Sequence, residues 1–188
     1  MIKEIIFDCF GVLMEDGWLV FLQKYQLPEN KDELDYINFQ YDKGIISYDE
    51  FLESACLITG VKKAQAHAII VSSLHPNSAL LYYIQDLKKR GYALGVISNV
   101  GMSLDTILPP EFIECFDVMT LSYQVHAIKP HPEIFKRHLR RTGFLPEETV
   151  FIDDRVVNCE GARMVGMGAI YYQNVTQVRR ELDSVLVK

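Results

Sequence analysis

Polar side chains that could do chemistry follow several short apolar runs of this sequence directly. These residues are Asp8, Ser98, Asp153 and Asp154, and Lys129 stands in a loop just before a proline that opens a helical pattern. A single Asp after an apolar run is usually a turn or helix cap, but this many positions are hard to produce by chance. If the runs are parallel strands, their carboxyl ends share one edge, and all five side chains face a common point.

The residue types suggest a particular reaction at that point. A carboxylate such as that of Asp8 can attack a phosphorus or carbon centre and form a covalent ester that water later opens. Several carboxylates at one place repel one another unless a hard cation neutralises them, and oxygen ligands suit Mg²⁺. A lysine and a hydroxyl directed at the same point would hold an anionic phosphoryl group.

The elements that must position these residues are short buried strands alternating with amphipathic helices. We predict strands at 5–7, 93–97, 118–121, 150–152 and 169–172, with helices at 80–90, 133–142 and 156–165 and a terminal helix at about 173–188. Gly91, Gly143 and Gly166 stand where such helices end. This alternation predicts an α/β fold, a doubly wound parallel sheet with helices on both faces.

The stretch 15–75 differs, because its apolar residues recur at helical spacing and no strand pattern interrupts them. We therefore expect residues 1–14 and 76–188 to form the core and residues 15–75 an inserted helical cap. The aromatic residues of the insertion are expected to form the cap's own interior, namely Trp18, Phe21, Tyr25, Phe39 and Tyr41.

Composition restricts the partners. The formal net charge is -6, with 49% hydrophobic and 23% charged residues, which is typical of a soluble globular protein and argues against a nucleic-acid surface. The basic groups at 88–90 and 137–141 are expected to be solvated helix faces. No signal peptide or membrane-spanning run is visible, and four scattered cysteines favour reduced thiols in the cytoplasm. The oligomeric state cannot be inferred.

Four sequence motifs, taken together, resemble the haloacid dehalogenase superfamily. They are Ile5-Ile6-Phe7-Asp8-Cys9-Phe10-Gly11-Val12-Leu13, Gly95-Val96-Ile97-Ser98-Asn99, Ile128-Lys129-Pro130 and Val150-Phe151-Ile152-Asp153-Asp154-Arg155. The phrase at 43–51 is similar to the small helical caps of that superfamily, including its sugar-phosphate phosphatases. The resemblance covers nearly the whole chain, and it implies a Mg²⁺-dependent phosphatase acting on a small phosphorylated metabolite.

The resemblance also implies a role for each residue. Asp8 would be the nucleophile that becomes aspartyl-phosphate, Ser98 and Asn99 would contact or shape the phosphate site, and Lys129 would neutralise charge between nucleophile and phosphate. The implied metal ligands are Asp8, Asp153, the backbone carbonyl of Phe10 and, directly or through water, Asp154.

Phe10 departs from the phosphatase pattern. The position two residues after the nucleophile usually holds an Asp that protonates the leaving oxygen, and help of this kind is worth about 10²–10⁴-fold in rate. Three interpretations stay open: a phosphatase that tolerates the loss, a 2-haloacid dehalogenase, or a weakly active or non-catalytic binding protein of this fold. An aromatic residue here is typical of dehalogenases, whereas the paired acids Asp153-Asp154 argue against one.

Two loop histidines and one cysteine could contribute further. His126 and His131 flank Lys129 and could supply the missing proton, although exposed loop positions are the commoner outcome for histidine. Cys9 lies beside the nucleophile, but its side chain should point away from Asp8 in an extended segment. Core packing is therefore the expected role of Cys9.

Overall fold

A five-stranded parallel sheet forms the centre of the protein. The computed structural model describes residues 1–25 and 30–186, and the strand order is β3-β2-β1-β4-β5 with every pair parallel. The strands are β1 Glu4–Phe7, β2 Ala93–Ser98, β3 Val118–Leu121, β4 Thr149–Asp153 and β5 Gly168–Tyr171. The predicted fold class is confirmed, and each predicted strand is present within one residue of its expected bounds.

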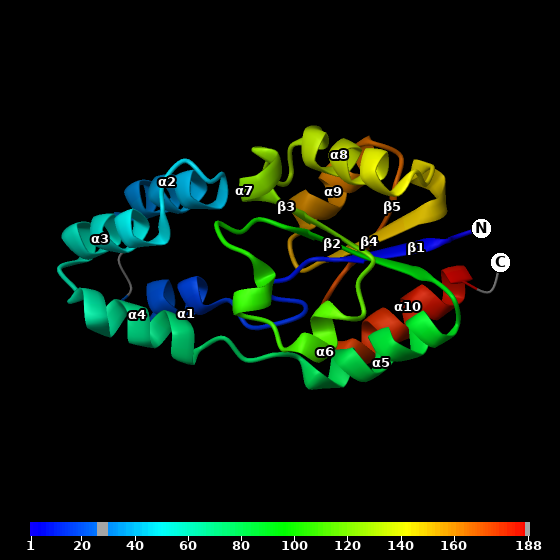
Figure 1. Cartoon of the computed structure of the whole chain (residues 1–188), viewed down its shortest axis with the longest axis horizontal. Helices are drawn as coiled ribbons and strands as arrows, with labels where there is room; N and C mark the ends of the chain where they lie inside the picture. Colours follow the sequence, from blue (N-terminus) through cyan, green and yellow to red (C-terminus); the bar gives the residue numbers. More distant parts are fainter. Residues whose placement is uncertain (26–29, 187–188) are drawn as a thin grey trace.

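Helices cover both faces of the sheet (Figure 1). One face is covered by α5 Ser78–Lys89, α6 Pro110–Ile113 and α10 Val175–Leu186, the other by α7 Ser122–Val125, α8 Pro132–Thr142 and α9 Val156–Met164. Two short 3₁₀ turns, Leu104–Thr106 and Pro146–Glu148, lie in the connections. The predicted terminal helix is present as α10, and positions 187–188 of that prediction lie outside the described residues.

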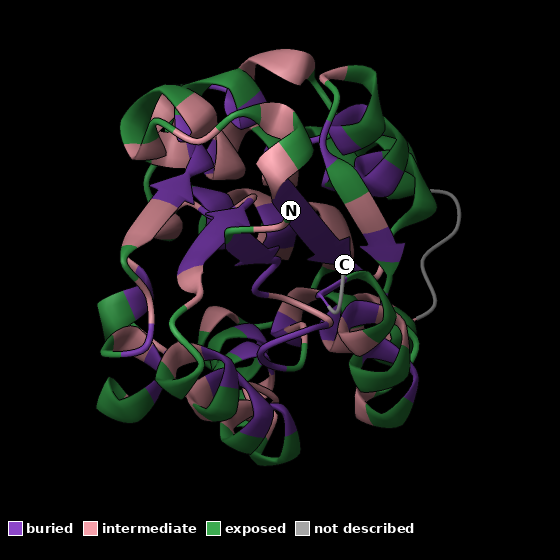
Figure 2. Ribbon diagram, turned by 90° about the vertical axis from the view of Figure 1, so that its right-hand side faces the viewer, coloured by how far each residue is buried: buried purple, intermediate pink, exposed green. Residues whose placement is uncertain are grey.

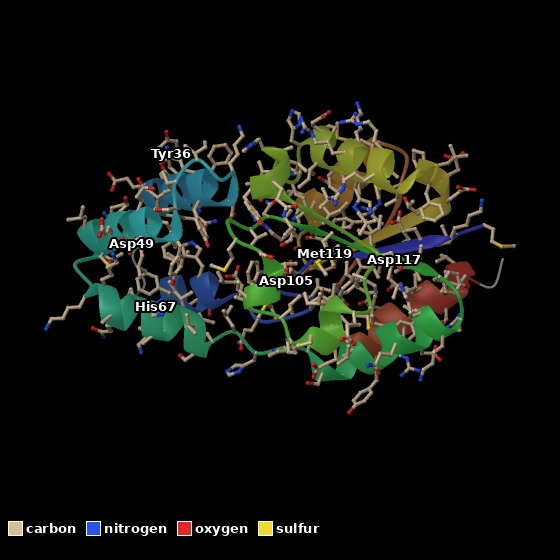
Figure 3. The ribbon with its side chains drawn as sticks, in the orientation of Figure 1. Tyr36, Asp49, His67, Asp105, Asp117 and Met119 are labelled. Carbon is tan, nitrogen blue, oxygen red and sulfur yellow. The ribbon has the colours of Figure 1, made fainter. Side chains whose placement is uncertain are left out.

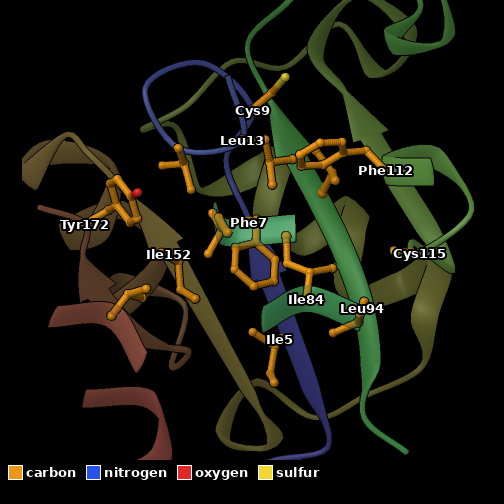
Figure 4. Close-up of a cluster of buried hydrophobic side chains, with 14 of the residues drawn as sticks. Ile5, Phe7, Cys9, Leu13, Ile84, Leu94, Phe112, Cys115, Ile152 and Tyr172 are labelled. Atoms are coloured by element: carbon orange, nitrogen blue, oxygen red, sulfur yellow. The ribbon is translucent and has the colours of Figure 1, made fainter. Parts of the chain in front are cut away.

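The alternation of side chains along the strands produces two hydrophobic layers. On β1, Ile5 and Phe7 enter a large cluster with α5, α6 and α10 (Figure 4), whereas Ile6 enters a smaller one with α8 and α9. Figure 2 shows the strands buried between these layers, with exposed residues on the outer sides of the helices. Because both faces are covered, the strands read as continuous apolar runs.

Four helices occupy most of the segment between β1 and β2 and lie beyond the carboxyl ends of the strands (Figure 1). They are α1 Gly17–Tyr25, α2 Lys31–Asp42, α3 Tyr48–Thr59 and α4 Lys63–Ser72. Their buried apolar residues form two clusters, around Phe21 and around Phe51, and Met102 from the loop after β2 packs against the second. The division into a core and a 15–75 cap stays a prediction, and residues 26–29 of that segment lie outside the described part of the chain.

Two expectations about individual side chains are wrong. His138 was expected on a solvated helix face, but it is fully buried, its Nδ1 lies 2.9 Å from Thr120 Oγ1 and its Nε2 lies 3.1 Å from Glu4 Oε1. Phe39 was expected inside the cap, but 37% of it is exposed. In both cases helical spacing alone did not say which face of the helix meets the rest of the molecule.

Within the described residues, no helix is long and apolar enough to cross a membrane.

Candidate active site

The carboxyl ends of β1 and β4 bring the predicted acids together. Phe7 pairs with Ile152 in the register of these neighbouring strands, so Asp8 and Asp153 emerge side by side. Carboxylate oxygens of Asp8, Asp153 and Asp154 all lie within 4.8 Å of one another. The chain therefore gathers at this edge the three acidic side chains that the sequence singled out.

Lys129 joins the acids as a buried cation. Its Nζ lies 2.6 Å from Asp8 Oδ1 and 2.7 Å from Asp153 Oδ2, and the residue is only 4% exposed. Asn99, just beyond β2, holds the lysine by its backbone: its side-chain amide donates to the Lys129 carbonyl (3.1 Å), and its Oδ1 accepts from the Lys129 N–H (2.8 Å). Asn99 thus positions Lys129.

The side chain of Asp153 is fixed by the start of α9. Its Oδ1 accepts from the Arg155 backbone N–H at 2.8 Å, and the Asn158 side-chain amide lies 3.0 Å from both carboxylate oxygens. Asn158 is buried, and sequence reasoning gave it no role. The available signal was its place in the first turn of a helix that directly follows a site carboxylate.

Asp154 lies against the loop that follows Asp8. A Cβ atom placed on Gly11 would be 2.1 Å from Asp154 Oδ2, and Gly11 has a φ of +83°. Only glycine adopts this conformation without strain and also leaves room for the carboxylate. Gly11 is therefore a requirement of the site as well as of the turn.

Ser98 is the last residue of β2, and its hydroxyl is fully buried. Among the residues that the structure describes, its Oγ has no hydrogen-bond partner. Leaving a buried polar group unsatisfied costs roughly 1–3 kcal/mol. A phosphoryl oxygen placed between Asp8, Lys129 and Ser98 would satisfy this hydroxyl.

Burial dominates the electrostatics of the cluster. It raises the pKa of Asp8 well above its usual value, Asp153 adds to the effect and Lys129 opposes it. Burial also raises the pKa of Asp153, but Lys129 and hydrogen bonds from its neighbours outweigh this and hold the pKa below its ordinary value. Desolvation lowers the pKa of Lys129, yet the two carboxylates keep that pKa raised overall.

The donor set fits a divalent cation. Three carboxylates face a single lysine, so the cluster has two negative charges in excess when all are ionised. Burial and the neighbouring Asp153 raise the pKa of Asp154, as expected where like charges share a site. A hard cation with charge +2 would remove both the repulsion and the excess.

Phe10 is partly buried, and its side chain packs against the large hydrophobic cluster. The assignment of its backbone carbonyl as a metal ligand stays a prediction. Cys9 is fully buried in the same cluster, as expected, and burial raises the pKa of its thiol well above the usual value, with Asp8 adding to the effect. A protonated thiol is a poor nucleophile, so Cys9 has a packing role.

The loop histidines make other contacts. His126 is exposed and its Nδ1 lies 3.2 Å from the Lys43 carbonyl, while the exposed His131 accepts from the Glu133 N–H at the start of α8. His67 lies on α4 (Figure 3), and its Nδ1 is 3.0 Å from the Tyr48 hydroxyl of α3. Each of the three histidines thus uses its Nδ1 in a contact outside the Asp8–Lys129 cluster.

A comparison with known protein families decides the class of this arrangement. Residues 5–171 match the family described as haloacid dehalogenase-like hydrolase. The chain belongs to this family. The match confirms the resemblance seen in the four motifs and the prediction of a hydrolase.

Relatives within the haloacid dehalogenase-like family include several named phosphatases. The chain is 28% identical to D-ribitol-5-phosphate phosphatase of Bacteroides thetaiotaomicron over 99% of both proteins. It is 33% identical to mouse bifunctional epoxide hydrolase 2, but that match covers 58% of this chain and only 21% of the hydrolase. The chain thus spans a small part of that hydrolase and nearly all of the ribitol-5-phosphate phosphatase.

Solved structures of the same family share the fold. An HAD family enzyme from Bacteroides thetaiotaomicron, in complex with magnesium and inorganic phosphate, aligns with a TM-score of 0.75 and 29% identity over 92% of this chain and 95% of that one. An L-2-haloacid dehalogenase from Xanthobacter autotrophicus aligns with a TM-score of 0.65 over 98% of this chain and 83% of that one. Its identity of 16% establishes the common fold alone.

Proposed function

We propose that this protein is a Mg²⁺-dependent phosphatase that hydrolyses a small phosphate monoester through an aspartyl-phosphate intermediate. The observation that carries the proposal is the Asp8–Lys129 contact of 2.6 Å inside a cluster of three carboxylates. The named phosphatases among its relatives, and the family enzyme crystallised with magnesium and phosphate, support this class of substrate.

In the proposed reaction, each residue of the cluster has a separate chemical role. Asp8 attacks the phosphorus, and Lys129 and Ser98 hold the phosphoryl oxygens as negative charge develops on them. Asn99 keeps Lys129 in place, and Asn158 does the same for Asp153. Asp8, Asp153 and Asp154 would hold Mg²⁺, which when bound offsets their charge and polarises the phosphoryl group.

The first test is hydrolysis of p-nitrophenyl phosphate by the wild type and by Asp8→Asn, with Mg²⁺ and with EDTA. We expect activity that needs both the metal and Asp8. Asp49→Asn is a matched control, because Asp49 is exposed on α3, among the cap helices (Figure 3), and should leave the rate unchanged. Activity that persists in EDTA or in Asp8→Asn would contradict the proposal.

The dehalogenase alternative rests on Phe10 and is tested in the same preparation. A 2-haloacid dehalogenase releases halide from 2-chloropropionate with chelator present, because its reaction needs no cation. We expect no halide release, because the Asp8–Asp153–Asp154 cluster offers three carboxylates that can hold a metal, which a dehalogenase does not need. If neither reaction occurs, the site acts at most in binding.

A further inference from the structure

Phe10 leaves one step of the proposed reaction without a residue, namely protonation of the leaving oxygen. In a displacement at phosphorus, the attacking and leaving oxygens lie roughly in line. With Asp8 attacking from the end of β1, the leaving group points away from the sheet and toward the cap helices beyond the strand ends (Figure 1). The proton donor is therefore to be sought on the cap side of the site.

The carboxyl end of α2 lies at this junction. Asp42 is the last residue of α2, and its backbone carbonyl accepts a hydrogen bond from the Ser122 hydroxyl of α7. That hydroxyl also accepts from the Val100 N–H at 2.8 Å and lies 3.1 Å from the Val100 carbonyl, two residues after Ser98. The buried hydroxyl of Ser122 thus links the backbone of Asp42 to the loop that follows Ser98.

Neighbouring contacts strengthen the same junction. The Lys43 carbonyl lies 3.2 Å from His126 Nδ1, and Gly44 is packed against Tyr123, where an added Cβ would be 3.0 Å from the Tyr123 carbonyl oxygen. The ring of Tyr41 fills the space beside Gly101, because an added Cβ there would be 2.4 Å from Tyr41 Cε2. The residues on both sides of Asp42, namely Tyr41, Lys43 and Gly44, therefore all contact the rest of the protein.

The carboxyl group of Asp42 is in the electrostatic environment of the active site. Within residues 1–25 and 30–186, its one hydrogen bond comes from the Asn38 side-chain amide, at 3.1 Å from Oδ2. Burial raises the pKa of Asp42 to about 7; Asp16 adds to this, and Lys129, Asn38 and Arg155 oppose it. The charged groups around Asp42 therefore come from three separate places: Asp16 before α1, Lys129 in its loop, and Arg155 at the start of α9.

Other candidates at the same junction each make a hydrogen bond to the backbone through one side-chain atom. Asp16 accepts from the Leu19 N–H at 3.0 Å and so caps α1. Burial raises the pKa of Asp16, but its backbone hydrogen bonds and Arg155 oppose this. His126 and His131 use Nδ1 for the backbone contacts described above. Within the described residues, the Oδ1 of Asp42 has no hydrogen bond. The backbone of Asp42 is also tied through Ser122 to Val100, in the loop that follows Ser98.

We propose that Asp42 performs the acid–base work that Phe10 cannot, an inference that rests on the proposed phosphatase function. As Asp8 forms its bond to phosphorus, the Asp42 carboxylic acid gives its proton to the bridging oxygen, the P–O bond breaks and a neutral alcohol leaves. The resulting Asp42 carboxylate then takes a proton from water while the water oxygen attacks phosphorus. The bond between phosphorus and Asp8 breaks, inorganic phosphate is released, and the Asp8 carboxylate and the Asp42 acid are regenerated.

The test compares two leaving groups in Asp42→Asn. For an alkyl phosphate such as glycerol phosphate, we expect the rate to fall by about 10²–10⁴-fold, the usual contribution of general acid–base catalysis. p-Nitrophenolate leaves as a stable anion and needs no proton. With that ester the first step should stay fast and the second become slow, so a burst of p-nitrophenolate equal to the enzyme concentration should precede slow turnover.

Three controls make the result specific. Asp35→Asn changes an exposed acid on the same helix and should match the wild type. Asp42→Glu keeps the carboxyl group and should recover part of the alkyl phosphatase rate. Inorganic phosphate should bind Asp42→Asn as it binds the wild type, which verifies that the variant is folded and its phosphate site intact.

The possible outcomes separate the two proposals. If Asp42→Asn loses both substrates equally and shows no burst, or keeps the alkyl phosphatase rate, Asp42 is not the acid, while the phosphatase function of the wild type stands. If the wild type itself has no activity that depends on Mg²⁺ and Asp8, the proposed function fails, and the role of Asp42 fails with it.

Discussion

Three carboxylates and one lysine at the strand ends give the site its character at the scale of single residues. Lys129 contacts Asp8 and Asp153 directly, while burial and the neighbouring Asp153 raise the pKa of Asp154. A lysine alone leaves the cluster with excess negative charge when its acids are ionised. A divalent cation should therefore stabilise the folded protein as well as serve the reaction.

Added Mg²⁺ should raise the free energy of unfolding of the wild type. A ligand that binds only the folded state stabilises it by about 2.7 kcal/mol at one hundred times its Kd. Asp154→Asn removes one carboxylate oxygen and one negative charge from the proposed metal site, so we expect weaker Mg²⁺ stabilisation in this variant. Thermal melting in Ca²⁺-free buffer with increasing Mg²⁺ measures the stabilisation of the wild type and of Asp154→Asn. Asp49→Asn is the control variant. An equal Mg²⁺ response in Asp154→Asn would remove this residue from the metal site.

Phe10 and Asp42 make a second prediction by rescue. If Asp42 already supplies the proton, Phe10→Asp alone should change alkyl phosphate turnover little. In the Asp42→Asn background, the same substitution should recover a measurable part of the lost rate, because it places a carboxyl group two residues after Asp8. Steady-state rates of the two single variants and the double variant give the answer. A large gain in turnover from Phe10→Asp in the wild-type background would show that the wild-type protein has no proton donor for the leaving oxygen, and so would contradict the role of Asp42.

At the scale of elements, the site depends on how loops and helix starts meet the strand ends. The tight turn after β1 shows this most directly, because Gly11 combines a φ of +83° with a close approach to Asp154. A side chain at this position would therefore strain the turn and displace a site carboxylate at once. These two effects can be separated experimentally.

Gly11→Ala and Gly91→Ala form a matched pair. Both positions have positive φ, and forcing an L-residue there costs roughly 1–2 kcal/mol. An added Cβ meets nothing within 4 Å at Gly91, but would be 2.1 Å from Asp154 Oδ2 at Gly11. We expect similar losses of stability, and a loss of activity and Mg²⁺ response in Gly11→Ala only. Unchanged activity in Gly11→Ala would mean that Asp154 can move without consequence.

The same scale explains what the sequence could reveal. The strands were predictable because both faces are covered and their apolar runs end at polar residues, which also located Asp8, Ser98 and Asp153. Asn158 had a local signal, its place in the first turn of the helix after Asp153. Asp42 and the burial of His138 were not predictable, because each depends on which element packs beside it. The backbone of Asp42 in particular is held by the docking of α2 on α7, a contact between segments far apart in the chain.

At the scale of the whole molecule, the segment between β1 and α5 and the strand ends together form an acidic, desolvated region. Burial raises the pKa values of Asp8, Asp16, Asp42 and Asp154. In the folded state these groups retain protons at pH values where the unfolded chain has lost them, since an unperturbed Asp has a pKa of about 3.9. Such groups make the folded state less stable as the pH rises.

Asp42 should contribute to this trend between about pH 4 and pH 7. Its folded pKa of about 7 lies above the unfolded value, so its contribution is fully present below the unfolded pKa and is lost as the pH rises through the folded one. Asn does not titrate, so Asp42→Asn should remove this part of the slope. Relative to the wild type, the variant should gain stability at pH 8 compared with pH 5.

Urea denaturation at pH 5, 6, 7 and 8, in metal-free buffer, measures the difference. The other acids are present in both proteins, so subtracting the two curves isolates Asp42, and Asp35→Asn should run parallel to the wild type. Parallel curves for Asp42→Asn would place its carboxyl group in water rather than in the desolvated region. A diverging pair would show that a group suited to acid–base work lowers the stability of the empty enzyme at neutral pH, as expected for a carboxyl group retained for its chemistry.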